Sequence, residues 1–313
     1  KVPKFDFIGN RYYAYAFSGL LILAGIGSIV VKGGLRYGID FTGGAMVQLN
    51  FKPAVSAADL RKSIEKMNLG SIVVQDYGEK GQGGVLIRVE KTGADLKGLG
   101  ERIVGTLKTD FQGNSIDLRQ VEMVGPQVGR ELRDKAFWAV CYAMIGILIY
   151  AGWRFELKFS VAAVVALIHD VLITVGFFSI INKEIDLTVI AALLTIAGYS
   201  INDTIVVFDR FRENLHSMRK EPYTNIFNVS LNQTLSRTIL TSFTTVLVSI
   251  VLQLIGGEVI HSFALALTFG IFIGTYSSIF VASPIVWTWN NFMASRAPIK
   301  GTTGKPAMAV GKR

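Results

Sequence analysis

Six long apolar segments constrain this chain more than any other feature of its sequence. A helix needs about 20 consecutive apolar residues to cross a hydrocarbon core of about 30 Å. Segments of this kind occupy residues 12–31, 136–153, 159–181, 187–208, 238–255 and 260–289. Apolar residues make up 50% of the 313 residues, and they concentrate in these segments instead of spreading along the chain. The sequence therefore predicts an α-helical, multi-pass membrane protein with six transmembrane helices.

The first and last segments differ from the others in what surrounds them. Residues 12–31 are too long for the apolar part of a signal peptide and have no small-residue cleavage pattern after them, so we expect a retained membrane anchor. The segment 260–289 is long enough to tilt or to extend beyond the bilayer. Pro284, near its end, predicts either a kink or the point where the helix leaves the membrane.

The distribution of basic residues predicts the orientation. The short loops at 182–186 and 256–259 contain one basic residue, Lys183. Fifteen basic residues lie in segments on the opposite side of the membrane: Lys1, Lys4, Arg11, Arg154, Lys158, Arg210, Arg212, Arg219, Lys220, Arg237, Arg296, Lys300, Lys305, Lys312 and Arg313. Because short cytoplasmic segments are enriched in Lys and Arg, we expect both termini in the cytoplasm.

This orientation divides the chain into five parts. They are a cytoplasmic N-terminal tail (1–11), a first transmembrane helix (12–31), an external region (32–134), transmembrane helices 2–6 (135–290) and a flexible cytoplasmic tail (291–313).

The external region shows an ordered series of strand and helix patterns. Strands are predicted at 45–51, 71–77, 84–90 and 115–124, and amphipathic helices at 56–68 and 95–111. The order β-α-β-β-α-β is that of the ferredoxin-like α+β fold, which hosts many functions. We therefore expect one four-stranded antiparallel sheet with both helices on one face. The preceding segment GIDFTGG (38–44) is interpreted as a turn whose glycines supply positive φ angles.

Charge and cysteine content argue against several classes of function. The net charge is +9, but no basic stripe with interleaved aromatic residues occurs, so nucleic-acid binding is not indicated. The single cysteine, Cys141, lies in an apolar segment and excludes a disulfide framework. Because His169, His216 and His261 are scattered, we expect neither a zinc site nor another cofactor.

Ionisable residues inside the predicted spans are the candidates for chemistry. A charged side chain at the centre of a membrane helix costs about 2.5–3.5 kcal/mol on insertion scales, so its presence suggests a function. At a rise of about 1.5 Å per residue, His169 and Asp170 lie about 15 Å deep in the third span. Asp203 lies about 7 Å above the cytoplasmic edge of the fourth span. Tyr199, Asn202 and Asp203 fall on one broad polar face of that span.

The fifth span begins with Arg237 and Thr241. The long Arg237 side chain could extend to the cytoplasmic surface or reach inward to Asp203. A carboxylate beside a guanidinium that can withdraw would be a switchable proton site, and the alternative is a purely structural lock. His169 could equally be a hydrogen-bonded core histidine, and Asp170 could belong to a structural cluster. His169, Asp170, Tyr199 and Thr241 are therefore secondary candidates, as an intramembrane polar cluster.

Five motifs, taken in order, resemble those of a known family. They are GIDFTGG (38–44), VGPQVG (124–129), ALIHDVLIT (166–174), AGYSINDTIVVFDRFREN (197–214) and SLNQTLSRT (230–238). Each is weak alone, but together, between these spans, they are specific. The chain resembles the SecF family, which forms the smaller half of the bacterial SecD–SecF protein-export factor and belongs to the RND superfamily.

The resemblance implies a set of partners and a mechanism. It implies a bacterial inner-membrane protein with residues 32–134 in the periplasm, paired with SecD as a separate subunit or in one polypeptide. It also implies action beside the SecYEG translocon, with YajC and YidC, on unfolded preprotein. The proton-motive force would drive late translocation and release, with protons as coupling ion and no enzymatic reaction. The family's proton pathway maps onto Asp203 and Arg237, beside Asn202.

Two other functions were weighed. An RND-type proton-coupled exporter of lipid or small molecules would share the spans and the buried carboxylate, but it would have a larger external region. An intramembrane aspartyl protease would use Asp170 and Asp203 as a pair that shares one proton at about 3 Å. Their depths differ by about 9 Å at the rise of an α-helix, which argues against a protease.

Overall fold

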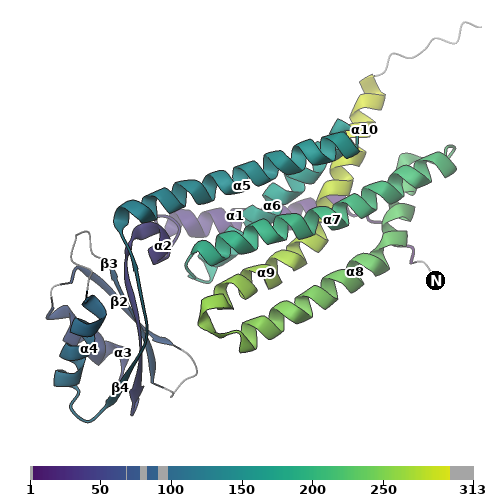
Figure 1. Ribbon diagram of the computed structural model, residues 1–313. Coiled ribbons are helices and arrows are strands. Elements are labelled where there is room, and N and C mark those ends of the chain that lie inside the picture. The colour runs from purple at the N-terminus through teal and green to yellow at the C-terminus, as the bar shows by residue number, and fades with distance from the viewer. Residues whose placement is uncertain (1–2, 68, 78–82, 91–97, 297–313) are drawn as a thin grey trace, which may run out of the picture.

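The computed structural model describes residues 3–67, 69–77, 83–90 and 98–296, and long helices form where the apolar segments occur. These helices are α1 (Arg11–Val31), α5 (Pro126–Arg154), α6 (Leu157–Ile180), α7 (Leu187–Ser217), α8 (Tyr223–Ile255) and α9 (Gly257–Ser277). Six helices in the described part of the chain are long and apolar enough to cross a membrane. They form one bundle, with a small sheet domain attached at one end (Figure 1). The predicted fold class is confirmed.

Three helices extend well beyond the apolar segments that predicted them. Helix α5 begins at Pro126 instead of near residue 136, with proline in its first turn, where the missing N–H has no helical partner to lose. Helices α7 and α8 run past the bilayer-length segments into a polar region. There the rings of Phe211 and Phe227 stack with centroids 3.7 Å apart, which fixes the two helix ends against each other.

The sixth apolar segment is a helix with a changed winding near its middle. Helix α9 continues through a single π-helical turn, η1 (Ser278–Ala282), into α10 (Ser283–Arg296). Pro284 lies in the first turn of α10, where it lacks an N–H and its ring would clash with a preceding carbonyl of a regular α-helix. The π turn relieves this clash. Pro284 therefore modifies the helix, which continues as far as Arg296.

The sheet domain has the predicted order of elements. These are β1 (Gly44–Lys52), α3 (Ala57–Glu65), β2 (Ser71–Tyr77), β3 (Gly84–Glu90), α4 (Leu99–Asp110) and β4 (Ser115–Val124). The strands pair antiparallel in the order β2-β3-β1-β4, as in the ferredoxin-like fold. Residue 68 and residues 95–97, which were included in the predicted helices, lie outside the described residues.

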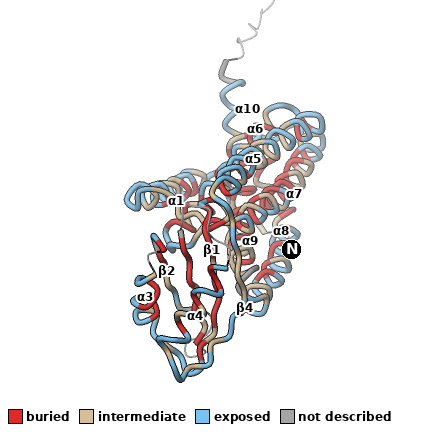
Figure 2. The backbone as a smooth tube through the Cα atoms, turned by 60° about the vertical axis from the view of Figure 1, so that its left-hand side comes forward, coloured by how far each residue is buried: buried red, intermediate tan, exposed pale blue. Residues whose placement is uncertain are grey.

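The core of this domain lies between one face of the sheet and both helices. Alternate residues of β1 enter it together with residues of β3, α3 and α4: Ala45, Val47, Leu49, Phe51, Val85, Ile87, Leu60, Ile64, Ile103 and Leu107. The central strand β1 is accordingly almost entirely buried (Figure 2). On the opposite face, the strand register places Arg88, Met46 and Glu122 in one row. This row faces away from α3 and α4 because side chains alternate along a strand.

The GIDFTGG segment is more than the turn that the sequence suggested. It contains a one-turn helix, α2 (Ile39–Thr42), whose Phe41 is buried against Phe178, Val189 and the rest of the adjoining bundle end. Gly43 has a φ of +74°, and a Cβ atom there would lie 2.6 Å from the Cα of Pro126. Glycine is required at this position because the backbone of α5 passes directly beside it.

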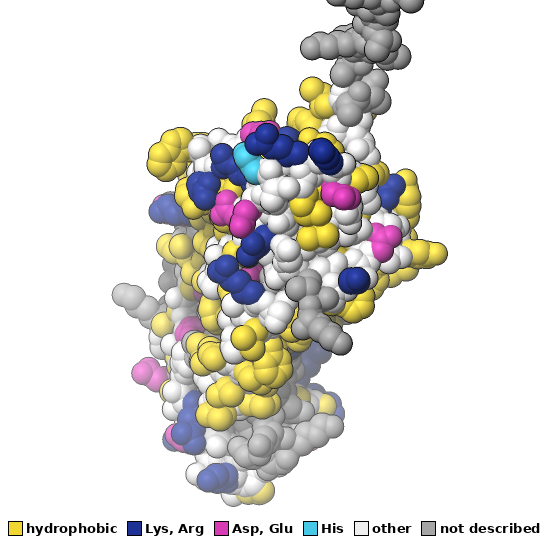
Figure 3. Space-filling model, turned by 90° about the vertical axis from the view of Figure 1, so that its right-hand side faces the viewer, with side chains coloured by type: hydrophobic (Ala, Val, Ile, Leu, Met, Phe, Trp, Pro, Cys, Tyr) yellow, Lys and Arg dark blue, Asp and Glu magenta, His cyan; other side chains and the backbone are white. Residues whose placement is uncertain are grey.

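The two ends of the bundle differ in character. The sheet domain adjoins one end, and the turn between α7 and α8 lies at the other (Figure 1). Seen from that second end, Lys and Arg side chains gather over the exposed helix ends, with apolar surface beside them (Figure 3). Arg210, Arg212, Arg219 and Lys220 lie in or next to the α7–α8 turn. These are four of the basic residues from which the orientation was predicted, and the orientation itself stays a prediction.

Candidate functional site

Two groups of buried polar residues lie inside the helical bundle. One is centred on Asp170 of α6 and the other on Asp203 of α7, and both carboxylates are buried. They face different neighbours because successive residues of an α-helix point about 100° apart. Ser200 and Thr204 of α7 contact α6 or η1, whereas Asp203 contacts α8.

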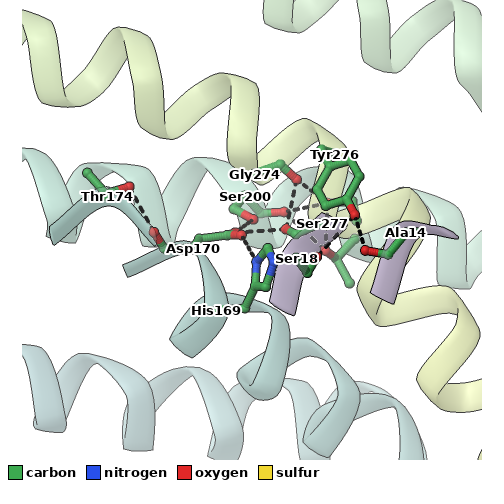
Figure 4. Close-up of polar contacts among 11 residues, drawn as sticks. Ala14, Ser18, His169, Asp170, Thr174, Ser200, Gly274, Tyr276 and Ser277 are labelled. Carbon is green, nitrogen blue, oxygen red and sulfur yellow. Dashed lines mark hydrogen bonds and ion pairs between the residues drawn. The ribbon is translucent and has the colours of Figure 1, made fainter. Parts of the chain in front are cut away.

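The Asp170 carboxylate accepts hydrogen bonds from three helices (Figure 4). The Ser200 and Ser277 hydroxyls donate to Oδ2 over 2.7 and 2.8 Å, and His169 Nδ1 lies 3.0 Å from Oδ1. A carboxylate in an apolar interior is expensive unless its oxygens are bonded in this way. Asp170 is thus a fully bonded junction between α6, α7 and α9.

His169 extends this junction to the first helix. Its Nε2 lies 2.9 Å from the Ser18 hydroxyl, which lies 3.0 Å from the Tyr276 hydroxyl. Tyr276 donates in turn to the Ala14 carbonyl over 2.8 Å. The polar network therefore joins α1 to α6, α7 and α9, and we call it the Asp170 network (His169, Asp170, Ser18, Ser200, Tyr276 and Ser277).

Asp203 is much less strongly bonded than Asp170. It is 4% exposed, and its hydrogen-bond contact is a long one of 3.5 Å from the Ser242 hydroxyl of α8. Ser242 lies 2.6 Å from the hydroxyl of Thr275 on α9, which is the closer of its two polar neighbours. A buried carboxylate with one weak donor is poorly stabilised in its ionised form. Asp203 is therefore the better candidate for a group that changes its protonation state.

Arg237 lies near Asp203 but is not paired with it in this structure. Its charge is close enough to act on Asp203, yet these two described side chains form no ion pair within 4.0 Å. Arg237 of α8 and Asn202 of α7 are both exposed. The predicted pair consequently requires the guanidinium to turn inward from the surface of this chain.

The four secondary candidates do not form one cluster. His169 and Asp170 are bonded to each other, whereas Tyr199 and Thr241 lie on the α7–α8 side of the bundle. Tyr199 contacts Thr245 over 3.4 Å, and the Thr241 hydroxyl bonds to the Arg237 and Thr238 carbonyls of its own helix. Four members of the Asp170 network were not predicted: Ser18, Ser200, Tyr276 and Ser277. Single serines in apolar segments usually bond to their own helix, so nothing in the sequence distinguishes these.

Asp170 and Asp203 do not form the pair that an aspartyl protease requires. The oxygens of Asp170 are bonded by His169, Ser200 and Ser277, and Asp203 contacts Ser242 on another helix. Two carboxylates that share a proton must be about 3 Å apart and accessible to water. Neither carboxylate has the other among its contacts in the described residues.

Two family models match the chain. "Protein export membrane protein SecD/SecF, C-terminal" matches residues 103–292, which contain α5 to α9, most of α10, and both Asp170 and Asp203. The "SecD/SecF GG Motif" matches residues 27–55, which contain α2 and Gly43.

Solved structures of similar proteins share the fold. The crystal structure of SecDF, a translocon-associated membrane protein from Thermus thermophilus, has a TM-score of 0.82 and 40% identity, over 92% of this chain. A structure of SecDF in a super-membrane-facing form has a TM-score of 0.68 and 39% identity, over 94% of this chain. The chain spans only 39% and 40% of the length of those two chains.

Curated relatives are similar over almost their whole length. The protein translocase subunit SecF of Magnetococcus marinus is 50% identical over 289 residues, which cover 91% of this chain and 92% of that one. The protein of the same description from Endomicrobium trichonymphae is 40% identical over 285 residues, 91% of each chain. The chain therefore belongs to the SecF family of protein-export membrane proteins.

Proposed function

We propose that this chain pairs with SecD and uses the proton-motive force to promote late translocation and release of preproteins exported through SecYEG. It would work in the bacterial inner membrane, with its termini in the cytoplasm, its sheet domain in the periplasm, and YajC and YidC as further partners. Relatives described as SecF translocase subunits support the Sec-pathway role. The proposal of a proton-driven step rests on one observation, the buried and weakly bonded Asp203 near the exposed Arg237 side chain.

The arrangement of Asp203 and Arg237 can couple a proton to helix movement. The ionised carboxylate is costly where it lies unless a cation approaches, so loss of a proton favours inward movement of Arg237. Protonation removes this attraction, and the guanidinium is free to return to the outer surface of α8. Because the two groups belong to α7 and α8, each change in protonation alters the force between these helices.

The available energy is sufficient for a two-state movement. One charge crossing a potential of 100 mV yields about 2.3 kcal/mol. Since about 1.4 kcal/mol corresponds to tenfold in an equilibrium constant, one proton can shift a two-state equilibrium by more than tenfold.

The outer surface of α7 supports a partner in the membrane. Thr195, Gly198 and Asn202 of α7 are exposed at helical spacing, as is Arg237 of α8. A polar side chain in contact with lipid has no hydrogen-bond partner, whereas small and polar residues favour close packing between helices. This surface suits the helices of SecD, which would enclose Asp203 and Arg237 between the two proteins. A single α/β unit outside the bundle gives no support to the exporter alternative.

The test compares two carboxylates of the same helix. Inverted membrane vesicles containing SecYEG, SecA, SecD and this chain are assayed for preprotein release with and without a proton gradient. Asp203→Asn should remain folded and bound to SecD but lose the response to the gradient. Asp209→Asn is the matched control, because Asp209 is exposed and bonded to Arg154 at the predicted cytoplasmic surface. A normal response from Asp203→Asn would show that the carboxylate is only a structural lock.

A further inference from the structure

The sheet domain is attached to the bundle at a place that the chain connections do not explain. The polypeptide enters the domain from α1 through α2 and leaves it into α5. Yet the loop between α6 and α7 (residues 181–186) also contacts it, although this loop is far away in the sequence. Side-chain, backbone and helix-end contacts all contribute to this attachment.

The side-chain contact is a cluster of three charges. Glu184 of the loop forms an ion pair with Arg88 of β3, and Arg36 lies 3.6 Å from the same carboxylate oxygen. Arg88 belongs to the row on the sheet face opposite α3 and α4, and its side chain is only 8% exposed. A buried arginine needs its counter-ion, because removing the partner leaves an uncompensated buried charge. Glu184 therefore holds the open face of the sheet against the bundle.

The backbone contact resembles a short parallel strand pair. Tyr37 and Ile185 form an isolated parallel bridge. Within it the Gly38 N–H donates to the Ile185 carbonyl over 2.8 Å, and the Ile185 N–H donates to the Arg36 carbonyl over 2.8 Å. Ile185 is also buried in the same apolar cluster as Phe41 of α2. The loop is thus fixed by two backbone bonds and by packing, and not by charge alone.

The third contact acts directly on the first turn of α7. The first N–H groups of a helix have no partner within it. Asp186 accepts from the Val189 N–H over 2.8 Å, as the helix's own cap. The neighbouring Leu187 N–H donates to the Asp40 carboxylate of α2 over 2.9 Å. One backbone N–H at the start of α7 is therefore hydrogen-bonded by Asp40, which belongs to the segment that leads into β1.

Helix α7 connects this attachment to the proton site. Asp203 is 16 residues beyond Leu187, which is about 24 Å along a helix axis. An α-helix packed on both sides moves as a stiff element, so a shift or rotation at Asp203 also moves the loop at its start. The contacts of that loop then act on the sheet domain.

We propose that Glu184, with Arg88 and Arg36, forms a permanent coupling that transmits movement of α7 to the sheet domain. This inference rests on the proposed function, in which Asp203 takes up and releases the proton. The three residues are positioning residues, since none of them contacts Asp203. They provide a direct route from the proton site to the domain, separate from the connections through α1 and α5.

The first experiment removes the ion pair and then replaces it with a covalent tether. In a Cys141→Ser background, Arg88→Cys is combined with Glu184→Cys and assayed in the vesicles described above. The double variant should keep gradient-independent translocation and lose gradient-dependent release. Treatment with a short bifunctional thiol reagent should restore that release. The proposal would be overturned if the double variant kept gradient-dependent release. It would also be overturned if the thiol reagent failed to restore that release.

The matched control uses an ion pair of the same domain that has no contact with the bundle. Arg61 and Glu65 of α3 lie 2.9 Å apart and are 60% and 55% exposed. Arg61→Cys with Glu65→Cys should leave gradient-dependent release unchanged, with or without the reagent. A normal response to the gradient from Asp203→Asn would count against the proposed function. A normal response from Arg88→Cys with Glu184→Cys, beside an unresponsive Asp203→Asn, would overturn the coupling alone.

The second experiment does not depend on transport. Spin labels are attached at Lys108→Cys on α4 and Glu213→Cys on α7, in the Cys141→Ser background, and their distance distribution is measured in the complete protein. The distribution should be narrow with Arg88 and Glu184 present. It should broaden with Arg88→Gln and Glu184→Gln if the coupling positions the domain. An equally narrow distribution in both proteins would overturn the inference regardless of any result on release.

Discussion

The Ser200 hydroxyl donates to the Asp170 carboxylate over 2.7 Å, and this bond joins α7 to α6 only three residues before Asp203. Helix α7 therefore bonds the Asp170 carboxylate of α6 through one face and carries the Asp203 carboxylate on another, and the two differ in how well they are stabilised. Asp170 is bonded on both oxygens, whereas Asp203 has one long contact. This difference assigns a structural role to Asp170 and leaves Asp203 as the group that can exchange a proton.

Replacing Asp170 should destabilise the protein more than replacing Asp203. Asp170→Asn can keep one amide oxygen as acceptor for the Ser200 and Ser277 hydroxyls, but its amide nitrogen then faces His169 Nδ1 where the second carboxylate oxygen stood. A buried donor without an acceptor costs about 1–3 kcal/mol. Thermal unfolding of the purified protein in detergent should show a clear loss for Asp170→Asn and a small one for Asp203→Asn. The folded fraction of Asp170→Asn should still respond to a proton gradient, and an abolished response would place Asp170 in the proton pathway.

The loss of gradient-dependent release in Arg237 variants should depend on how much of the charge and shape of the guanidinium the new side chain keeps. Arg237→Ala removes the cation near Asp203 and should impair gradient-dependent release as strongly as Asp203→Asn does. Arg237→Lys keeps a charge on a flexible chain but loses the planar fork, so part of the response should survive. Arg212→Ala is the control, because Arg212 is exposed near the end of α7. A full response from Arg237→Ala would mean that Asp203 works without this cation.

The glycine next to Pro126 should tolerate no side chain. Gly43→Ala combines a positive φ with a Cβ only 2.6 Å from the Cα of Pro126, so we expect a loss of more than about 1 kcal/mol in the free energy of unfolding. Gly105→Ala is the opposite case, because Gly105 lies in α4 with open space around it. Alanine there should stabilise the helix by up to about 1 kcal/mol. Equal melting temperatures for the two variants would contradict this account of the α2–α5 contact.

The sequence predicts local structure well where one pattern dominates. The strands at 71–77, 84–90 and 115–124 occupy the predicted residues because alternating apolar residues meet glycine-rich or polar turns at both ends. The ends of helices that extend beyond the apolar segments were harder to predict. An apolar segment of bilayer length shows which residues lie in the membrane, but not where the helix ends. Helix α5 accordingly begins at Pro126, earlier than its apolar segment.

Contacts between distant segments could not be predicted from any local pattern. Glu184 is one residue of a short polar loop, and its pairing with Arg88 depends on how the sheet is placed on the bundle. Arg237 was predicted at the cytoplasmic start of the fifth span, with a side chain that could extend outward or reach inward to Asp203. Their separation depends on the rotation of α7 and α8 about their own axes, and hydropathy carries no information on rotation between two mostly apolar helices.

An exposed apolar position on an edge strand should contact exported polypeptide. Strand β4 is at the edge of the sheet, and Leu118 on it is 39% exposed. An open edge can bind an extended chain through backbone hydrogen bonds with little sequence preference. A photoreactive amino acid at Leu118 should cross-link to a translocating preprotein, whereas one at Lys108 on α4 should not. Failure at Leu118 would place the polypeptide contact in SecD.

Acidification should strengthen the contact between the sheet domain and the bundle through Glu122. Burial raises the pKa of the Glu122 carboxyl above its ordinary value, and the charges of Asp40 and Asp186 add to this effect against an opposing hydrogen bond from Gln120. The folded protein then binds this proton more tightly than the unfolded chain does. The contribution of Glu122 to the free energy of unfolding therefore falls as the pH rises from about 4.3, the ordinary pKa of glutamate, through the raised pKa of Glu122.

Glu122→Gln should accordingly raise the melting temperature near pH 7–8, and its advantage over wild type should shrink toward about pH 4. Asp110 provides a comparison of opposite sign. A hydrogen bond from Ser63, together with Lys66, holds the pKa of the Asp110 carboxyl below its ordinary value. The contribution of the Asp110 carboxylate to the free energy of unfolding is present at neutral pH and is lost as pH falls through that lowered pKa. Asp110→Asn should therefore lower the melting temperature most at neutral pH. A lower melting temperature for Glu122→Gln at neutral pH would show that the Glu122 carboxylate stabilises the junction when ionised. Protonation of Glu122 could then not strengthen the contact between the sheet domain and the bundle.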